Sequence, residues 1–82
     1  MGNFKSNSKK IKTIELLNKN ILIAGFGRIG KNLIKKCLAF NMNVIVYDPC
    51  VDVKVIENFG GTKIDDFEKG LEEADFLSIH MP

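Results

Sequence analysis

The sequence predicts an α/β fold in which helices cover both faces of a parallel sheet. Three short apolar runs, residues 21–24, 44–47 and 76–79, are separated by amphipathic stretches. Strands of parallel sheets are buried on both faces, so they appear as unbroken apolar segments rather than as alternating ones. The amphipathic stretches between the runs are typical of the helical crossovers that parallel strands require.

The strands are predicted from composition as well as from hydrophobicity. Each of the three runs is rich in residues that suit a buried, pleated surface. Residues 62–64 follow Gly60 and Gly61 and predict a short additional strand at an edge of the sheet.

The stretch between the first two strands predicts a sheet-packing helix of about three turns. Its lysines face away from a stripe of apolar residues at helical spacing: Ile29, Leu33, Ile34, Cys37 and Leu38. Asn41 follows at the position where a helix end often needs a left-handed residue.

Two further short helices are expected. Residues 51–58 predict one that ends at Gly60 and Gly61. Residues 66–73 predict another, whose acidic first turn suits the positive end of the helix dipole.

Length and charge indicate one small domain or a piece of a larger one. The 82 residues divide into a basic lead-in, residues 1–19, and a slightly acidic body, residues 20–82. The lead-in lysines are accompanied by one aromatic residue, Phe4, and by no arginine, so a solvated segment is favoured over nucleic-acid or membrane binding. No run approaches the roughly 18 apolar residues of a membrane span, and no secretory signal is evident, so a cytoplasmic location is expected.

The two cysteines predict neither a disulfide framework nor a metal site. Cys37 and Cys50 are thirteen residues apart, with no CxxC pair and only one histidine in the chain. Cys37 lies on the apolar helical stripe and is expected in the core, whereas Cys50 follows a turn and is expected to be at least partly exposed.

A glycine-rich motif follows the first strand directly and opens the first long helix. Gly25-Phe26-Gly27-Arg28-Ile29-Gly30 is a G-x-G-x-x-G, which is specific for dinucleotides only in this strand–turn–helix context. In that context Gly25 permits a tight turn, Gly27 lets a pyrophosphate approach the backbone, and Gly30 allows close helix–strand packing. The helix N-terminus would then offer unpaired N–H groups to the phosphates. The motif predicts a Rossmann-type fold.

Asp48 is the candidate partner of the adenosine ribose. It lies eighteen residues past Gly30, at the carboxyl end of the second strand, near the spacing expected for the acid that binds a ribose hydroxyl. A carboxylate there would repel an additional 2′-phosphate, so NAD is predicted rather than NADP. A turn-forming Asp before Pro49 is the alternative and is compatible with the same role.

These motifs, in their order, resemble the D-isomer-specific 2-hydroxyacid dehydrogenases, a family that includes the phosphoglycerate dehydrogenases. The resemblance spans nearly the whole chain. It includes the lead-in residues 15–19, the glycine motif, residues 39–42 before the second strand with Asp48 and Pro49, and a closing E-A-D-x-x-S-x-H-x-P at residues 73–82.

The resemblance implies NAD as the cofactor and a set of cofactor-binding residues. The backbone around Arg28 and Ile29 would cradle the pyrophosphate, with the Arg28 side chain as a further phosphate partner. The implied cofactor-binding set is Gly25, Gly27, Arg28, Ile29, Gly30, Asp48, Pro49, His80, Met81 and Pro82. His80 would line the cofactor and is not the family's catalytic histidine, and Asp75 is expected to be a polar strand-start residue.

Three positions depart from the family pattern. Asn18 and Asn41 replace glycines, and Ile34 stands where the family usually has an alanine against the sheet. Ile34 therefore requires compensating space in the helix–sheet interface.

The family reaction moves a hydride between C2 of a D-2-hydroxy acid and nicotinamide, using a His–Glu pair and a substrate-binding Arg. The resemblance implies that these groups lie downstream of Pro82. We therefore expect the N-terminal part of an NAD-binding domain, covering about four of six strands, that is inactive in isolation and leaves an unpaired apolar edge strand. The full-length parent is expected to be a homodimer or larger. The alternatives are an NAD-sensing corepressor of the same fold and a β-hydroxyacid dehydrogenase.

Overall fold

A computed structural model describes residues 13–81 of the chain. The elements along the chain are α1 (Thr13–Leu16), β1 (Asn20–Ala24), α2 (Arg28–Ala39), β2 (Asn43–Tyr47), α3 (Val53–Asn58), β3 (Thr62–Lys63), α4 (Phe67–Glu73) and β4 (Phe76–Ile79). The predicted strands and the three predicted helices are all present. Pro82 and the lead-in lysines up to Lys12 lie outside the described residues.

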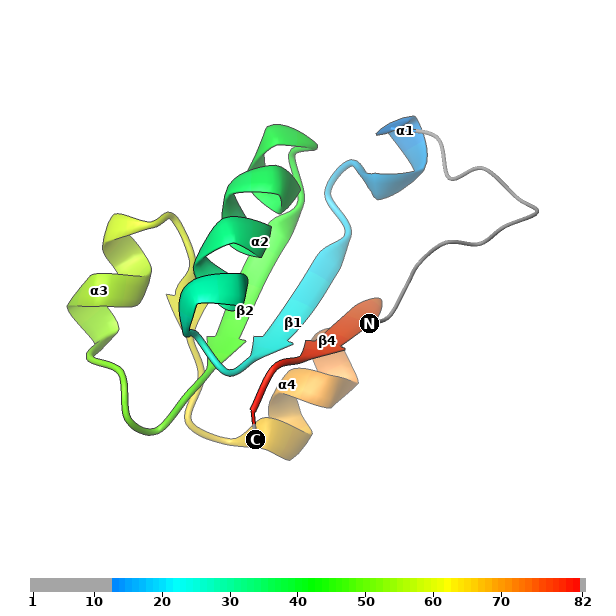
Figure 1. Cartoon of the computed structure of the whole chain (residues 1–82). Helices are drawn as coiled ribbons and strands as arrows, with labels where there is room; N and C mark the ends of the chain where they lie inside the picture. Colours follow the sequence, from blue (N-terminus) through cyan, green and yellow to red (C-terminus); the bar gives the residue numbers. More distant parts are fainter. Residues whose placement is uncertain (1–12, 82) are drawn as a thin grey trace.

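The four strands form one parallel sheet in the order β3-β2-β1-β4 (Figure 1). In β1, Asn20 pairs with Asn43 of β2, and Ile21 pairs with Phe76 of β4. The predicted additional strand, β3, lies at one edge, and β4 forms the other, with no partner beyond it among residues 13–81. The α/β class and the parallel sheet are thus confirmed.

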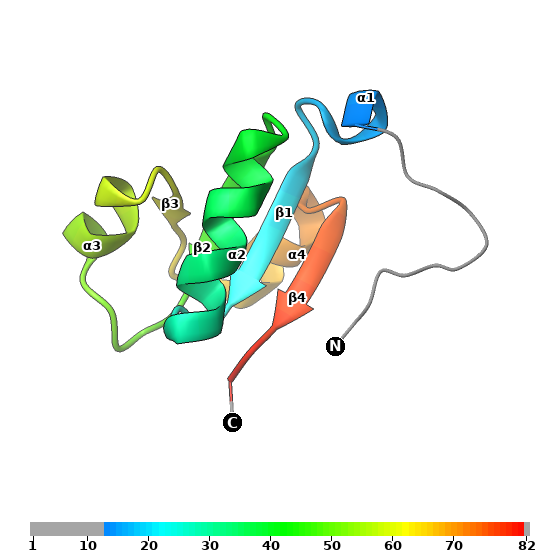
Figure 2. The ribbon, with the colours of Figure 1, turned by 45° about the horizontal axis from the view of Figure 1, so that its top comes forward.

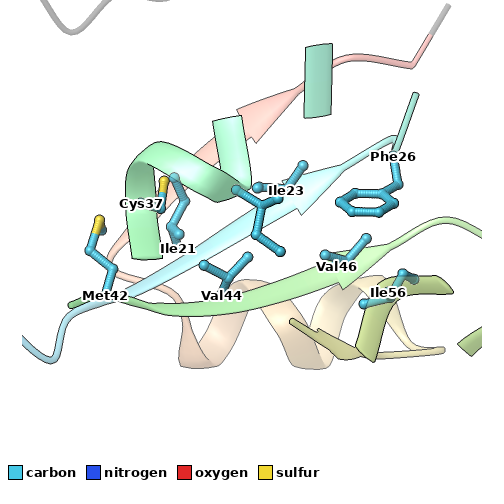
Figure 3. Close-up of a cluster of buried hydrophobic side chains, with 9 residues drawn as sticks. Ile21, Ile23, Phe26, Cys37, Met42, Val44, Val46 and Ile56 are labelled. Carbon is cyan, nitrogen blue, oxygen red and sulfur yellow. The ribbon is translucent and has the colours of Figure 1, made fainter. Parts of the chain in front are cut away.

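Helices cover both faces of the sheet, with α2 and α3 on one face and α4 on the other (Figure 2). The main core lies between the sheet and α2 and α3, where β-branched strand residues meet apolar helix residues (Figure 3). Its buried members are Ile21, Ile23, Phe26, Ile34, Cys37, Met42, Val44, Val46 and Ile56. On the opposite face, Gly70 of α4 lies against the side chain of Leu22.

The buried side of α2 differs from the predicted stripe at one residue. Gly30, Ile34 and Cys37 are buried, and their spacing of four and three residues defines one line along the helix. Ile29 is 63% exposed, so its assignment to the core stripe was wrong. The reason is angular: Ile29 is rotated by about 100° from Gly30 around the helix axis, away from the sheet.

Both asparagines that replace family glycines adopt left-handed backbone conformations. Asn18 has φ 62° and Asn41 has φ 61°, and no other non-glycine residue in the described part of the chain has positive φ. Asparagine tolerates this region better than other residues with a Cβ. The left-handed residue predicted after α2 is therefore confirmed, and the substitutions keep the backbone shape that the family's glycines allow.

Gly61 supplies the space that Ile34 requires. Ile34 is fully buried, and a Cβ added at Gly61 would lie 3.0 Å from the Ile34 Cδ1 atom and 3.2 Å from Ile56 Cγ2. Because Gly61 has no side chain, there is room for isoleucine at position 34 of α2, where the family usually has an alanine.

The two cysteines lie where the sequence places them. Cys37 is buried, Cys50 is exposed, and both are free thiols. Burial raises the pKa of the Cys37 thiol, because a thiolate is poorly solvated in the core. Among residues 13–81 no cluster of three potential metal ligands occurs, and no helix is long and apolar enough to cross a bilayer.

Candidate functional site

The candidate site lies where the carboxyl ends of β1, β2 and β4 meet. The Gly25 N–H donates to the Tyr47 carbonyl at 2.9 Å, and the His80 N–H donates to the Ala24 carbonyl at 2.7 Å. These bonds continue the strand pairing into the loops, so the glycine motif, the Asp48 turn and the segment after β4 emerge at one edge of the sheet (Figure 1). Nine of the ten predicted cofactor-binding residues lie in these segments, and Pro82 falls outside the described residues.

The three positions of the motif are occupied by glycine for different structural reasons. Gly25 has φ +100°, and an added Cβ would lie 2.7 Å from Met81 Cγ and 2.9 Å from the His80 carbonyl carbon. An added Cβ at Gly30 would lie 2.5 Å from the Gly25 carbonyl oxygen. At Gly27 an added Cβ would meet nothing within 4 Å. Gly25 and Gly30 are therefore required by packing, whereas nothing in the described chain requires Gly27 to lack a side chain.

The N-terminus of α2 is left open to an anion. Gly27 is the N-cap and provides no side-chain cap, and the first turn contains no acidic residue. Helix α4 shows the ordinary alternative, because the Asp66 carboxylate accepts from the N–H groups of Glu68 at 3.0 Å and Lys69 at 3.3 Å. An uncapped helix start has free N–H donors and partial positive charge. The exposed Arg28 side chain adds a full positive charge at the same place.

Asp48 links the glycine loop to the end of β2. Its Oδ2 accepts from the Phe26 N–H at 2.8 Å, and its Oδ1 accepts from the Cys50 N–H at 3.0 Å. The turn-forming alternative is therefore realised by the hydrogen bond to Cys50. The hydrogen bond to Phe26 also connects Asp48 to the glycine motif, which the sequence spacing alone did not reveal. A carboxylate has about four acceptor sites, so Asp48 retains capacity for sugar hydroxyls.

Phe26 anchors the glycine loop to the hydrophobic core. Its ring is 2% exposed and makes an edge-on contact with Phe59, with ring centroids 5.4 Å apart. The sequence pattern predicts no role for Phe26. The signal that could have indicated a buried anchor was an aromatic residue at the first variable position of the motif. With the ring buried and the N–H held by Asp48, the loop is fixed at both its side chain and its backbone.

The segment after β4 forms the remaining wall. The Ser78 hydroxyl lies 2.7 Å from His80 Nε2, which orients the imidazole, and Met81 packs against Gly25. Asp75 lies at the other end of β4, where its carboxylate accepts from the Asn20 N–H at 2.8 Å. Its predicted role as a polar strand-start residue is confirmed.

The whole chain matches a known family. The model described as "D-isomer specific 2-hydroxyacid dehydrogenase, NAD binding domain" matches residues 1–82. The chain belongs to this family. The expected NAD cofactor is confirmed at the level of the family, and the match favours this family over the β-hydroxyacid dehydrogenases.

Individual relatives agree with this assignment. The D-3-phosphoglycerate dehydrogenase of Methanocaldococcus jannaschii is 40% identical over 74 residues, which are 90% of this chain and 14% of that protein. The hydroxypyruvate reductase of Thermotoga maritima is 37% identical over 81 residues, or 95% of this chain and 24% of that protein. The chain thus spans between a seventh and a quarter of the length of these two relatives.

Solved structures share the fold. A D-lactate dehydrogenase with NAD⁺ from Lactobacillus jensenii matches with a TM-score of 0.67 and 34% identity, over 78% of this chain and 18% of that one. The apo D-lactate dehydrogenase of Escherichia coli matches with a TM-score of 0.72 and 25% identity, over 82% of this chain and 21% of that one.

Proposed function

We propose that this chain binds the pyrophosphate and adenosine ribose of NAD in an oxidoreductase that transfers a hydride between a D-2-hydroxy acid and NAD. The observation that carries the proposal is the open face of Gly27 at the uncapped start of α2. A site of this kind attracts phosphate through N–H donors and the helix dipole, and a residue without a side chain permits close approach.

Each residue of the proposed site has a distinct task. The N–H groups of Arg28 and Ile29 would bind phosphate oxygens, and the Arg28 guanidinium would pair with the same charge. Gly25 and Gly30 would keep the loop and helix close enough to the strand for these groups to converge. Pro49, His80, Met81 and Pro82 would line the adenosine side of the cofactor.

Asp48 would accept hydrogen bonds from the ribose hydroxyls. Because its two oxygens are already positioned by the N–H groups of Phe26 and Cys50, the carboxylate does not have to be ordered when the ribose arrives. Its negative charge disfavours a 2′-phosphate, which supports a preference for NAD over NADP.

The bound nicotinamide would supply or accept the hydride. We assign neither substrate binding nor proton transfer to a residue of this chain. A phosphoglycerate-like hydroxy acid is proposed as substrate because phosphoglycerate dehydrogenases are among the most similar relatives. A homodimeric or larger assembly and a cytoplasmic location stay predictions.

Calorimetric titration of the intact protein that carries this chain, with NAD and with NADP, tests the proposal. We expect binding of NAD that is tighter than binding of NADP, together with NADH formation from a D-2-hydroxy acid in a panel of such acids. The absence of heat with either dinucleotide would refute the binding site. Binding without turnover of any acid in the panel would favour the NAD-sensing alternative over the enzyme.

A further inference from the structure

The turn after Asp48 is held by a side chain that is distant in sequence. Within the turn, the Val51 N–H donates to the Asp48 carbonyl at 3.2 Å and the Cys50 N–H donates to Asp48 Oδ1 at 3.0 Å. The Val51 carbonyl accepts from Lys63 Nζ at 2.7 Å. One end of the turn is thus held by the carboxylate and the other by an ammonium group.

Lys63 reaches the turn from the edge of the sheet. It lies on β3, where it pairs with Val46 of β2, and its side chain is half-buried. No carboxylate of residues 13–81 forms an ion pair with it, so its one described polar partner is the neutral Val51 carbonyl. Hydrogen bonds with one charged partner are shorter and stronger than neutral ones, and this bond is both short and partly shielded from water.

The turn benefits from this support because its middle residues are poorly packed, and Val51 is its contact with the hydrophobic core. Pro49 and Cys50 are exposed, Val51 is half-buried, and α3 begins at Val53. A short exposed turn that must present a carboxylate in one orientation pays an ordering cost on binding unless it is already fixed.

We propose that Lys63 is a positioning residue for the adenosine-ribose subsite: its ammonium holds the Val51 carbonyl and so keeps the Asp48 turn in its binding conformation. The inference rests on the proposed function, since it names a determinant of the same cofactor site. Lys63 acts through the turn and is not itself required to touch the cofactor.

The test compares three ligands of the intact protein: NAD, AMP and inorganic pyrophosphate. AMP contains the adenosine ribose, whereas pyrophosphate occupies only the phosphate end. Lys63→Met keeps the length and the apolar stem but removes the donor. It is expected to weaken NAD and AMP about tenfold, the loss of roughly one hydrogen bond, and to leave pyrophosphate within about twofold.

Two variants separate positioning from a general structural effect. Lys63→Arg retains a charged donor and is expected to restore AMP affinity to within about threefold of the original. Lys69→Met alters an exposed lysine of α4, on the opposite face of the sheet, and is expected to change none of the three affinities. Circular dichroism verifies folding, and Lys63→Gln replaces Lys63→Met should the latter not fold.

The outcomes distinguish the inference from the function on which it rests. If the original protein binds NAD and Lys63→Met binds AMP equally well, the inference is overturned and the proposed function stands. Equal weakening of AMP and pyrophosphate also overturns it, because the effect would then be general. If the original protein binds none of the ligands, the proposed function fails and the inference fails with it.

Discussion

Replacement of Gly27 by alanine separates cofactor binding from folding. The added methyl group meets no atom of the described chain within 4 Å, so the folded protein has room for it. The same methyl group would occupy the space through which a pyrophosphate approaches the N–H groups of α2. The substitution should therefore impair NAD binding and leave the fold intact.

The expected effect of Gly27→Ala on stability is small. Gly27 has φ −90° and ψ −151°, an extended conformation with negative φ, so alanine does not meet the strain of the left-handed region there. Alanine is a poorer N-cap than glycine, but it also reduces the conformational freedom of the unfolded chain by about 0.4–1 kcal/mol, and the two effects oppose each other. We expect the free energy of unfolding to change by less than about 1 kcal/mol.

The expected effect on NAD affinity is much larger. Displacing the pyrophosphate costs at least one hydrogen bond to a charged acceptor, about 1.5–3 kcal/mol. That loss corresponds to a rise of about 10- to 150-fold in the Kd for NAD. Calorimetry on the intact protein measures the affinity, and urea unfolding of the variant measures its stability.

Gly30→Ala serves as the matched comparison within the same motif. Its Cβ would lie 2.5 Å from the Gly25 carbonyl oxygen, so the backbone must shift, at a cost of about 1–3 kcal/mol of stability. Gly30→Ala should lower the free energy of unfolding, whereas Gly27→Ala should weaken NAD binding with little change in the free energy of unfolding. A Gly27→Ala protein that binds NAD within about twofold of the original would refute the location of the pyrophosphate.

The other predictions concern the ribose acid, a left-handed asparagine and the thiols. Asp48→Ser should raise the Kd for NAD and narrow the preference over NADP, because it removes both the sugar acceptor and the repulsive charge; titrations that leave both constants unchanged would contradict this. Asn41→Ala should lower the free energy of unfolding in urea by about 1–2 kcal/mol, because φ 61° is costlier for alanine than for asparagine, whose short polar side chain can hydrogen-bond locally. Asn41→Gly should not lower it, and equal stability of the two variants would count against the explanation. Because burial raises the pKa of Cys37 above its ordinary value of 9.0, its contribution to stability is complete below that value and is lost as the pH rises through the folded-state pKa. As the pH rises through this range, the free energy of unfolding in urea should therefore fall more steeply for the original chain than for Cys37→Ala. Parallel curves for the two proteins would disprove this contribution of Cys37. In the folded chain Cys50 should react with a thiol reagent well before Cys37.

Much of the backbone could be predicted because its signals are local. The apolar runs predicted β1, β2 and β4. Strands buried on both faces require continuous hydrophobicity, as in β1 and β2, whereas Leu77 and Ile79 of the edge strand β4 are exposed. The paired glycines before residue 62 predicted the short edge strand. The left-handed turn at Asn41 was also predictable, because helix ends impose a backbone conformation that few residue types tolerate.

The candidate site was predictable as a set of positions but not as a set of contacts. The glycine motif and the spacing to Asp48 placed the residues at one edge, because parallel strands end on the same side of a sheet. Ile29 was misassigned because hydrophobic periodicity does not reveal that the first turn of α2 directs this side chain away from the sheet. Phe26 was overlooked because its role depends on Phe59, which directly follows α3 and is distant in the sequence.

Sequence pattern was therefore sufficient for the class of fold, the elements and the chemistry of the glycine loop, all of which depend on neighbouring residues. Three contacts became visible only in three dimensions. They are the hydrogen bond from Lys63 to the Val51 carbonyl, the two hydrogen bonds to the Asp48 carboxylate, and the packing of Ile34 against Gly61. Each joins segments that lie far apart along the chain, and which side chains meet across such a distance depends on the order and register of the strands. A loop is predictable from the residues within it, but its rigidity comes from partners elsewhere in the fold.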